Sequence, residues 1–194
     1  MPFEPTSAIV RGLYDHLQRR YGSRLVDRSE SKPFQVLADL VSLLGIADRE
    51  SYLRRTVTTI GHTIYAPFTP GEASPPYDLW TQIVVAAHEH EHIVQAEESG
   101  GDLAFILRYL VSPSDRAVFE ARAFFSTFEL EYWRYGEVRT SVDTITKIIS
   151  GSYGLGANDV LAARAALVVG LDVARVGGLS PATREVIKYL AGAV

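Results

Sequence analysis

The sequence contains no cysteine among its 194 residues. The chain therefore cannot form disulfides, and it cannot build the thiolate zinc sites of zinc fingers and ribbons. Any bound metal ion must be held by His, Glu, Asp or water. The sequence also lacks an apolar run near the roughly 20 residues that a membrane helix needs, and its start lacks the features of a secretory signal. We therefore expect a cytoplasmic protein that does not bind to membranes.

Neither charge sign dominates the sequence. The chain carries 19 Lys and Arg residues against 23 Asp and Glu residues, which gives a formal net charge of -4. It has no basic stripe interleaved with aromatic residues, which is the usual footprint of nucleic-acid binding. Because 47% of the residues are hydrophobic, a chain of this length can bury a core. We expect one domain, residues 1–194, that does not bind nucleic acid.

Apolar periodicity and helix-end signals predict helices over most of the chain. Residues 1–50 are expected to form a helical scaffold, with helices over 7–21 and 31–44. A different pattern begins at Thr56 and ends at Tyr65, where β-branched residues dominate. Such a run favours a strand, and we predict a single strand here.

Beyond a loop rich in Pro and Gly, the sequence predicts helices again. The expected ranges are 77–95, 102–110, 114–135, 142–149, 158–176 and 181–190. Residues 56–135 are expected to form the metal-binding core, and residues 140–194 a helical C-terminal part. The sequence therefore predicts an α+β, mostly helical fold, with one small sheet packed on the helix over 77–95.

Three of the five histidines lie within residues 88–92, which read His-Glu-His-Glu-His. On a strand, the three imidazoles would share one face. On a helix, His88 and His92 would share a face, while His90 would point about 200° away from His88. The flanking residues show no alternation with a period of two and continue a helical apolar stripe. We therefore predict a helix, with His90 at the surface or half-buried.

Two imidazoles one helical turn apart can provide two ligands of a tetrahedral zinc site. Glu89 follows the first of these histidines, so its carboxylate can reach a metal-bound water without binding the metal itself. A catalytic zinc also needs a third protein ligand. The longer motif with a third His is excluded, because Gln95 and Glu98 stand where that motif requires Gly and His.

The third ligand is expected to be a carboxylate from a later helix, and Glu120 is the best candidate. It lies among apolar and small residues, where a lone carboxylate is costly to bury unless a cation meets it. A salt bridge with Arg116 or Arg122 on the same helix is the alternative. Glu129 and Glu131 lie in a more polar stretch, and we expect them on a solvated face.

This pattern resembles the small gluzincin-type zinc metallopeptidases of bacteria and their phages, in which His-Glu-x-x-His is followed by a glutamate ligand. The stretches that carry the resemblance are residues 88–95, 105–110 and 119–124. It implies a zincin-like fold and a zinc-dependent endopeptidase. The implied Zn²⁺ ligands are His88, His92 and Glu120. Glu89 is the implied general base, which takes a proton from a zinc-activated water and passes it to the leaving amine.

The resemblance also implies a site for an extended substrate. The strand from Thr56 to Tyr65 matches the edge strand that pairs with a protein or peptide substrate in this family. A second group would stabilise the oxyanion. Its candidates are Tyr109, Arg122, His62 and Tyr153, of which Tyr109 is retained as the catalytic candidate.

Two other functions fit the same residues. A non-catalytic zinc-binding protein with a structural or interaction role, such as a phage virion or assembly component, would close the metal site with a fourth protein ligand. A helical interaction module without a metal would leave the histidines in solvent. Zinc analysis of protein purified without a His tag separates this last function from the other two.

Overall fold

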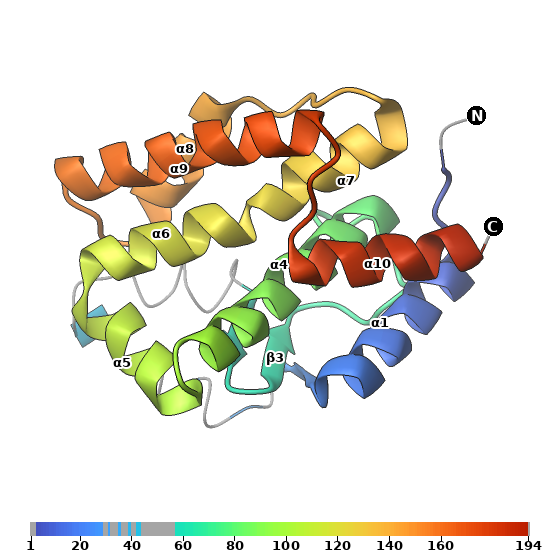
Figure 1. Ribbon diagram of the computed structural model, residues 1–194. Helices are drawn as coiled ribbons and strands as arrows, with labels where there is room; N and C mark the ends of the chain where they lie inside the picture. Colours follow the sequence, from blue (N-terminus) through green and yellow to red (C-terminus); the bar gives the residue numbers. More distant parts are fainter. Residues whose placement is uncertain are drawn as a thin grey trace.

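A computed structural model shows a mostly helical chain with a small three-stranded mixed sheet (Figure 1). Its described residues are 3–28, 31, 35, 39, 42–43 and 57–193. Thr56 and most of the predicted helix over 31–44 lie outside them. The expectation of an α+β, mostly helical fold is confirmed. No helix in the described part is long and apolar enough to cross a membrane.

Helices precede and follow a group of short strands along the chain. The helices are α1 (Ser7–Tyr21), α4 (Leu79–Glu98), α5 (Asp102–Val111), α6 (Pro113–Ala123), α7 (Phe125–Tyr135), α8 (Val142–Ser152), α9 (Ala157–Arg175) and α10 (Pro181–Gly192). The strands, which lie between α1 and α4 in the sequence, are β1 (Arg24–Asp27), β2 (Thr58–Ile60) and β3 (Thr63–Ala66). The three predicted C-terminal helices correspond to α8, α9 and α10.

The sheet has the strand order β1-β3-β2. β1 runs parallel to β3, with Arg24 opposite Thr63. β2 runs antiparallel to β3, with Thr59 opposite Ile64. The prediction of one continuous strand is wrong, because the chain turns between β2 and β3 at Gly61. This residue has a φ of 56°, which glycine adopts without steric cost.

Helix α4 occupies the centre of the molecule (Figure 1) and contacts α1, α5, α6, α7, α10 and β2. Asp78 caps its N-terminus by accepting a hydrogen bond of 2.7 Å from the backbone N–H of Thr81. The buried side chain of Gln82 makes three hydrogen bonds to backbone groups of the preceding loop. One hydrophobic cluster packs α4 against α1 and α10, and a second joins α6, α7, α8 and α9.

The predicted helix over 114–135 is interrupted. α6 ends at Ala123, and α7 begins two residues later, with Phe124 between them. The hydroxyl of Ser126 donates a hydrogen bond of 2.7 Å to the carbonyl oxygen of Ala123 and so competes with the helical hydrogen bond. The interruption brings the ring of Phe124 to 4.7 Å from that of His88, measured between centroids.

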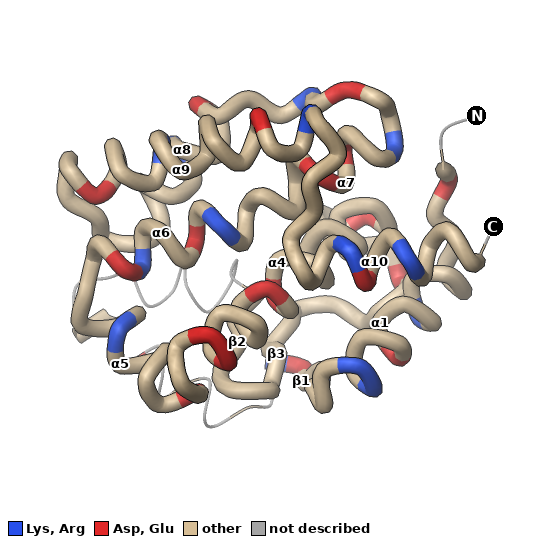
Figure 2. The backbone as a smooth tube through the Cα atoms, in the orientation of Figure 1, with Lys and Arg blue, Asp and Glu red and all other residues tan. Residues whose placement is uncertain are grey.

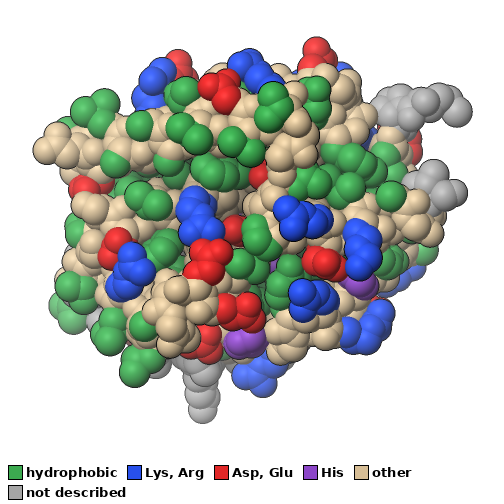
Figure 3. All heavy atoms as spheres, viewed as in Figure 1, with side chains coloured by type: hydrophobic (Ala, Val, Ile, Leu, Met, Phe, Trp, Pro, Cys, Tyr) green, Lys and Arg blue, Asp and Glu red, His purple; other side chains and the backbone are tan. Residues whose placement is uncertain are grey.

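The surface carries both charge signs and some apolar area. Lys and Arg positions are interleaved with Asp and Glu positions along the elements (Figure 2). Several hydrophobic side chains reach the surface in the upper part of Figure 3, where Figure 1 places α9. In that helix Leu161 is 63% exposed and Val169 is 61% exposed. α9 therefore has an apolar strip at the surface as well as a buried face.

Candidate metal site

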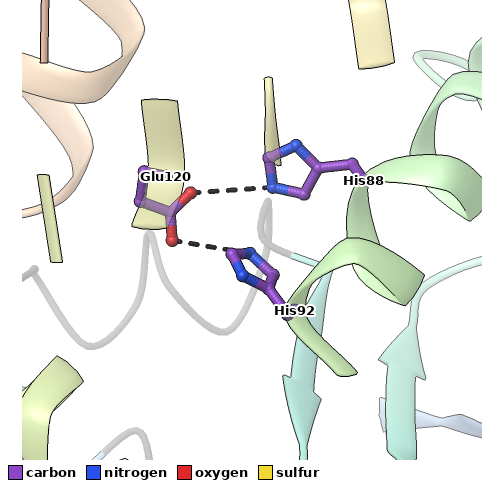
Figure 4. Close-up of side chains that lie close together, drawn as sticks. All are labelled: His88, His92 and Glu120. Atoms are coloured by element: carbon purple, nitrogen blue, oxygen red, sulfur yellow. Dashed lines mark ion pairs between the residues drawn. The ribbon is translucent and has the colours of Figure 1, made fainter. Parts of the chain in front are cut away.

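Two histidines of α4 lie opposite a glutamate of α6 (Figure 4). His88 and His92 share one face of the helix, as the predicted helix requires. Their Nε2 atoms lie 3.6 and 3.7 Å, respectively, from the two carboxylate oxygens of Glu120. One ligand atom from each of the three residues lies within 4.8 Å of the others. The structure thus brings together the three residues that the sequence singled out as metal ligands.

The distances between the imidazole nitrogens and the carboxylate oxygens fit a shared metal ion better than direct hydrogen bonds. Nitrogen and oxygen ligands about 2.0–2.2 Å from a tetrahedral zinc ion are roughly 3.4 Å apart. The separations of 3.6 and 3.7 Å are close to that value. They exceed the roughly 2.7–3.2 Å of an N–H···O hydrogen bond. The three groups are therefore spaced to surround an ion.

The carboxylate of Glu120 lacks a protein partner for one of its oxygens. The side chain is 2% exposed, and its Oε2 atom is buried without a hydrogen-bond partner among the described residues. Its Oε1 atom accepts a hydrogen bond of 2.5 Å from the hydroxyl of Tyr109. Burial acts to raise the pKa of Glu120, but the neighbouring His92 and His88 outweigh it and lower the pKa to about 2. A buried carboxylate oxygen to which no described protein group donates a hydrogen bond favours a cation as its partner.

The arginines on the same helix are engaged elsewhere. Arg116 is buried and donates to backbone carbonyl oxygens at the end of α5 and after α8. Arg122 lies 2.9 Å from a carboxylate oxygen of Glu98 and 3.5 Å from one of Glu91. Neither of the alternative salt bridges with Glu120 is present, so its carboxylate is left to face the histidines.

Gln95 fixes the orientation of His92. Oε1 of Gln95 lies 2.9 Å from Nδ1 of His92, and its Nε2 atom donates a hydrogen bond of 3.0 Å to the carbonyl oxygen of Phe119. Because the amide nitrogen must face that carbonyl, the amide oxygen accepts the proton of Nδ1. Nε2 of His92 then presents its lone pair toward Glu120, as is usual for a metal-binding histidine. Sequence reasoning missed this role, although a polar residue three positions beyond His92 on a helix was a usable signal.

Glu89 lies beside these three groups. It is 4% exposed, and its Oε2 atom accepts a hydrogen bond of 2.7 Å from the hydroxyl of Thr59 on β2. Burial is the main cause that raises the pKa of Glu89 to about 7, while His92 and the Thr59 hydroxyl oppose the rise. A carboxyl group with this pKa can both accept and release a proton near neutral pH. The contact with Thr59 was not predicted from the sequence.

A cavity of about 70 Å³ adjoins these residues. It is lined by Val57 and β2, by the motif residues of α4, by side chains of α5, and by Glu120 and Tyr153. The described lining is largely apolar and includes no Lys or Arg. The site therefore combines buried acids and imidazoles with apolar surroundings that limit access of water.

The four oxyanion candidates separate in space. Tyr109 and Tyr153 line the cavity. Arg122 and His62 do not. Arg122 pairs with Glu91 and Glu98 of α4, and Nδ1 of His62 lies 2.8 Å from the carbonyl oxygen of Tyr21. Only the two tyrosines remain as candidates.

The opposite face of α4 is also buried, and the prediction of a surface or half-buried His90 is wrong. His90 is fully buried, with Nδ1 2.7 Å from the carbonyl oxygen of Ala86 and Nε2 2.9 Å from the hydroxyl of Ser23. The carbonyl oxygen can only accept, so Nδ1 carries the proton and Nε2 accepts from the hydroxyl. Burial lowers the pKa of His90 to about 4. A neutral His90 thus ties α4 to the residue that precedes β1.

Glu91 anchors the C-terminal helix. It is 1% exposed, and its Oε2 atom accepts a hydrogen bond of 3.3 Å from the backbone N–H of Ala182, in the first turn of α10. Burial raises the pKa of Glu91 to about 7. A carboxylate at a helix N-terminus also interacts favourably with the helix dipole.

The prediction that Glu129 and Glu131 lie on a solvated face is wrong as well. They are 3% and 9% exposed. Glu129 accepts hydrogen bonds from the backbone N–H and the hydroxyl of Ser180, just before α10. Glu131 accepts from the backbone N–H groups of Arg139 and Thr140. Both acids are buried because they satisfy backbone groups of loops that pack on α7.

No protein-family model matches the chain, and no curated protein or solved structure matches it. The function must therefore be inferred from the residues of the site and their surroundings.

Proposed function

We propose that the protein is a zinc-dependent endopeptidase of the gluzincin type. Its zinc ligands are His88, His92 and Glu120, and its general base is Glu89. The observation that carries the proposal is the buried Oε2 atom of Glu120, which lacks a hydrogen-bond partner among the described residues and lies 3.6 Å from Nε2 of His88, while Oε1 of the same carboxylate lies 3.7 Å from Nε2 of His92.

The donor set favours zinc in a catalytic site. Two imidazole nitrogens and one carboxylate oxygen are ligands that zinc commonly takes, and three protein ligands leave a position open. No fourth His, Asp or Glu joins the group within the described residues, which disfavours a closed structural site. When bound there, zinc would supply a Lewis acid for the scissile carbonyl and an acidified water.

Glu89 would move the proton. Its carboxylate lies next to the ligand group and lines the same cavity. It would accept a proton from the attacking water and deliver it to the nitrogen of the leaving amine. The raised pKa of about 7 supports this double role, because the group can hold the proton between the two transfers.

Tyr109 would act indirectly, by orienting the metal ligand Glu120. Its hydroxyl donates to Glu120, so the bond holds this carboxylate in place, as groups around metal ligands commonly do. We therefore assign Tyr109 to orienting Glu120. Tyr153, which also lines the cavity, becomes the candidate for the oxyanion.

The substrate would be an extended stretch of protein. β2 lies at one end of the described strand order β1-β3-β2 and lines the cavity, so strand addition along β2 would bring a peptide to the site. The described lining has no Lys or Arg to bind a terminal carboxylate, which favours cleavage within a chain over removal of a C-terminal residue.

The test uses protein purified without a His tag. We expect about one zinc ion per chain by elemental analysis, and cleavage of an unfolded protein that chelation stops and added zinc restores. Glu120→Gln should weaken both zinc binding and cleavage. One zinc ion per chain without cleavage would favour the structural zinc protein. The lack of stoichiometric zinc would contradict both zinc-dependent functions.

A further inference from the structure

Thr59 is the one hydrogen-bond donor to the Glu89 carboxylate within the described part of the chain. Its hydroxyl lies 2.7 Å from Oε2 of Glu89 and 3.3 Å from the backbone carbonyl oxygen of the same residue. A hydroxyl has a single proton to donate, and the shorter contact to a charged acceptor is the stronger one. The side chain of Glu89 is therefore held at one oxygen.

Thr59 belongs to the strand that lines the cavity. It is the middle residue of β2, it lies opposite Ile64 of β3, and β2 contacts α4. Its side chain reaches Glu89 on α4, while the strand itself contributes to the cavity lining. The same strand thus touches the proposed base and the place where substrate would lie.

We propose that Thr59 is a positioning residue for Glu89, with its hydroxyl holding one carboxylate oxygen so that the other faces the attacking water. The inference rests on the proposed function, because the orientation of Glu89 matters to the rate only if Glu89 is the base. A general base must lie within hydrogen-bond reach of the proton that it takes. Without the hydroxyl, the carboxylate can rotate about its own side-chain bonds and lose that alignment.

Two substitutions separate the hydroxyl from the shape of the side chain. Thr59→Val keeps the β-branched shape and removes the donor, and kcat should fall about 10- to 100-fold while KM changes less than about twofold. Thr59→Ser keeps the donor and should restore most of kcat. Both variants should retain the zinc content of the wild type. A kcat of Thr59→Val equal to that of the wild type, or a Thr59→Ser variant as slow as Thr59→Val, would overturn the proposal.

Thr63→Val is the matched control. Thr63 lies on the neighbouring strand β3, away from the cavity lining, and its hydroxyl accepts a hydrogen bond of 2.9 Å from Nε of Arg24. This variant removes a hydroxyl from the same sheet and should leave kcat unchanged. An equal loss of kcat in Thr63→Val would assign the effect to sheet stability instead of to Glu89.

A crystal structure of Thr59→Val gives a result that does not depend on activity. We expect the Glu89 carboxylate in a new orientation or in more than one orientation. An unchanged single orientation would overturn the positioning role. If the zinc-loaded wild type cleaves no protein, the proposed function fails, and this structure still decides whether Thr59 orients the carboxylate.

Discussion

Glu89 and Glu91 lie two residues apart on α4 and share their residue type, their burial and the direction of their pKa shift. They are 4% and 1% exposed, and burial raises the pKa of both to about 7. Their neighbours differ. Glu89 lines the cavity beside the candidate ligands, whereas Glu91 accepts from the backbone of α10. Burial and a raised pKa alone therefore do not distinguish a catalytic acid from a structural one. The role proposed for Glu89 depends on the groups that lie within reach of its carboxylate.

The largest expected contrast is in catalysis. Glu89→Gln should lower kcat by roughly 10²–10⁴ with zinc retained, because the amide cannot take the proton. Glu91→Gln should retain activity within about threefold, since this side chain faces α10. Initial rates on an unfolded protein substrate, normalised to zinc content, measure both. Equal losses of activity in Glu89→Gln and Glu91→Gln would contradict the functional distinction between these two faces of α4.

The second contrast is in stability, and Glu91 is the residue that shows it. Its pKa rises from 4.5 unfolded to about 7 folded, so the unfolded state loses its proton first as the pH rises. The free energy of unfolding should therefore fall by about 3 kcal/mol between pH 4.5 and 7 through this group, and level off above that. Glu91→Gln removes this slope, so its stability relative to the wild type should increase over the same window.

Urea unfolding of the metal-free proteins, with a chelator present at each pH, measures this difference. Glu97→Gln, on the exposed side of the same helix, is the matched control and should change stability by less than about 0.5 kcal/mol. A difference between Glu91→Gln and the wild type that does not vary with pH would contradict the assigned burial of the charge.

A smaller effect is expected at Gln95, whose carbonyl oxygen sets the tautomer of His92. Gln95→Leu should weaken zinc binding roughly 10- to 100-fold. Competition with a chromophoric chelator measures the affinity. Gln82 is another buried glutamine of α4, and its side chain bonds to the preceding loop. Gln82→Leu should therefore lower the melting temperature without changing zinc affinity. Equal affinities of Gln95→Leu and the wild type would show that Gln95 does not orient the ligand.

The smallest expected effect is that of Tyr109→Phe. Glu120 keeps its charge and loses one hydrogen bond, so zinc affinity should fall less than about tenfold. The same competition assay and initial rates measure the outcome. A loss of kcat above about 10² with unchanged zinc affinity would assign Tyr109 to the oxyanion instead of to Glu120.

The sequence predicted features that depend on local spacing and on the cost of burying charge. The helix over 88–92 followed from its flanks, and Glu120 followed from its apolar surroundings. Features set by distant segments were not predicted. The buried His90 is bonded to Ser23, which is 67 residues away in the sequence. The buried Glu91 is bonded to Ala182, which is 91 residues away.

The sheet shows the same limit. β1 is four residues long and pairs with β3, so no local pattern distinguishes it from a loop. The β-branched run is split at a single residue, Gly61, which has a positive φ. A glycine within such a run can mark a turn or a bulge, so the sequence pattern did not show that one strand ends there. The interruption at Phe124 depends on a hydroxyl of Ser126 that competes for a helix carbonyl.

A crystal structure of the zinc-loaded protein, with the anomalous signal of zinc recorded, tests the central claim most directly. We predict a single zinc peak about 2.0–2.2 Å from Nε2 of His88, from Nε2 of His92 and from a carboxylate oxygen of Glu120, with Glu89 near the ion but not bound to it. A zinc ion held by a fourth protein side chain, or no peak between α4 and α6, would contradict the account.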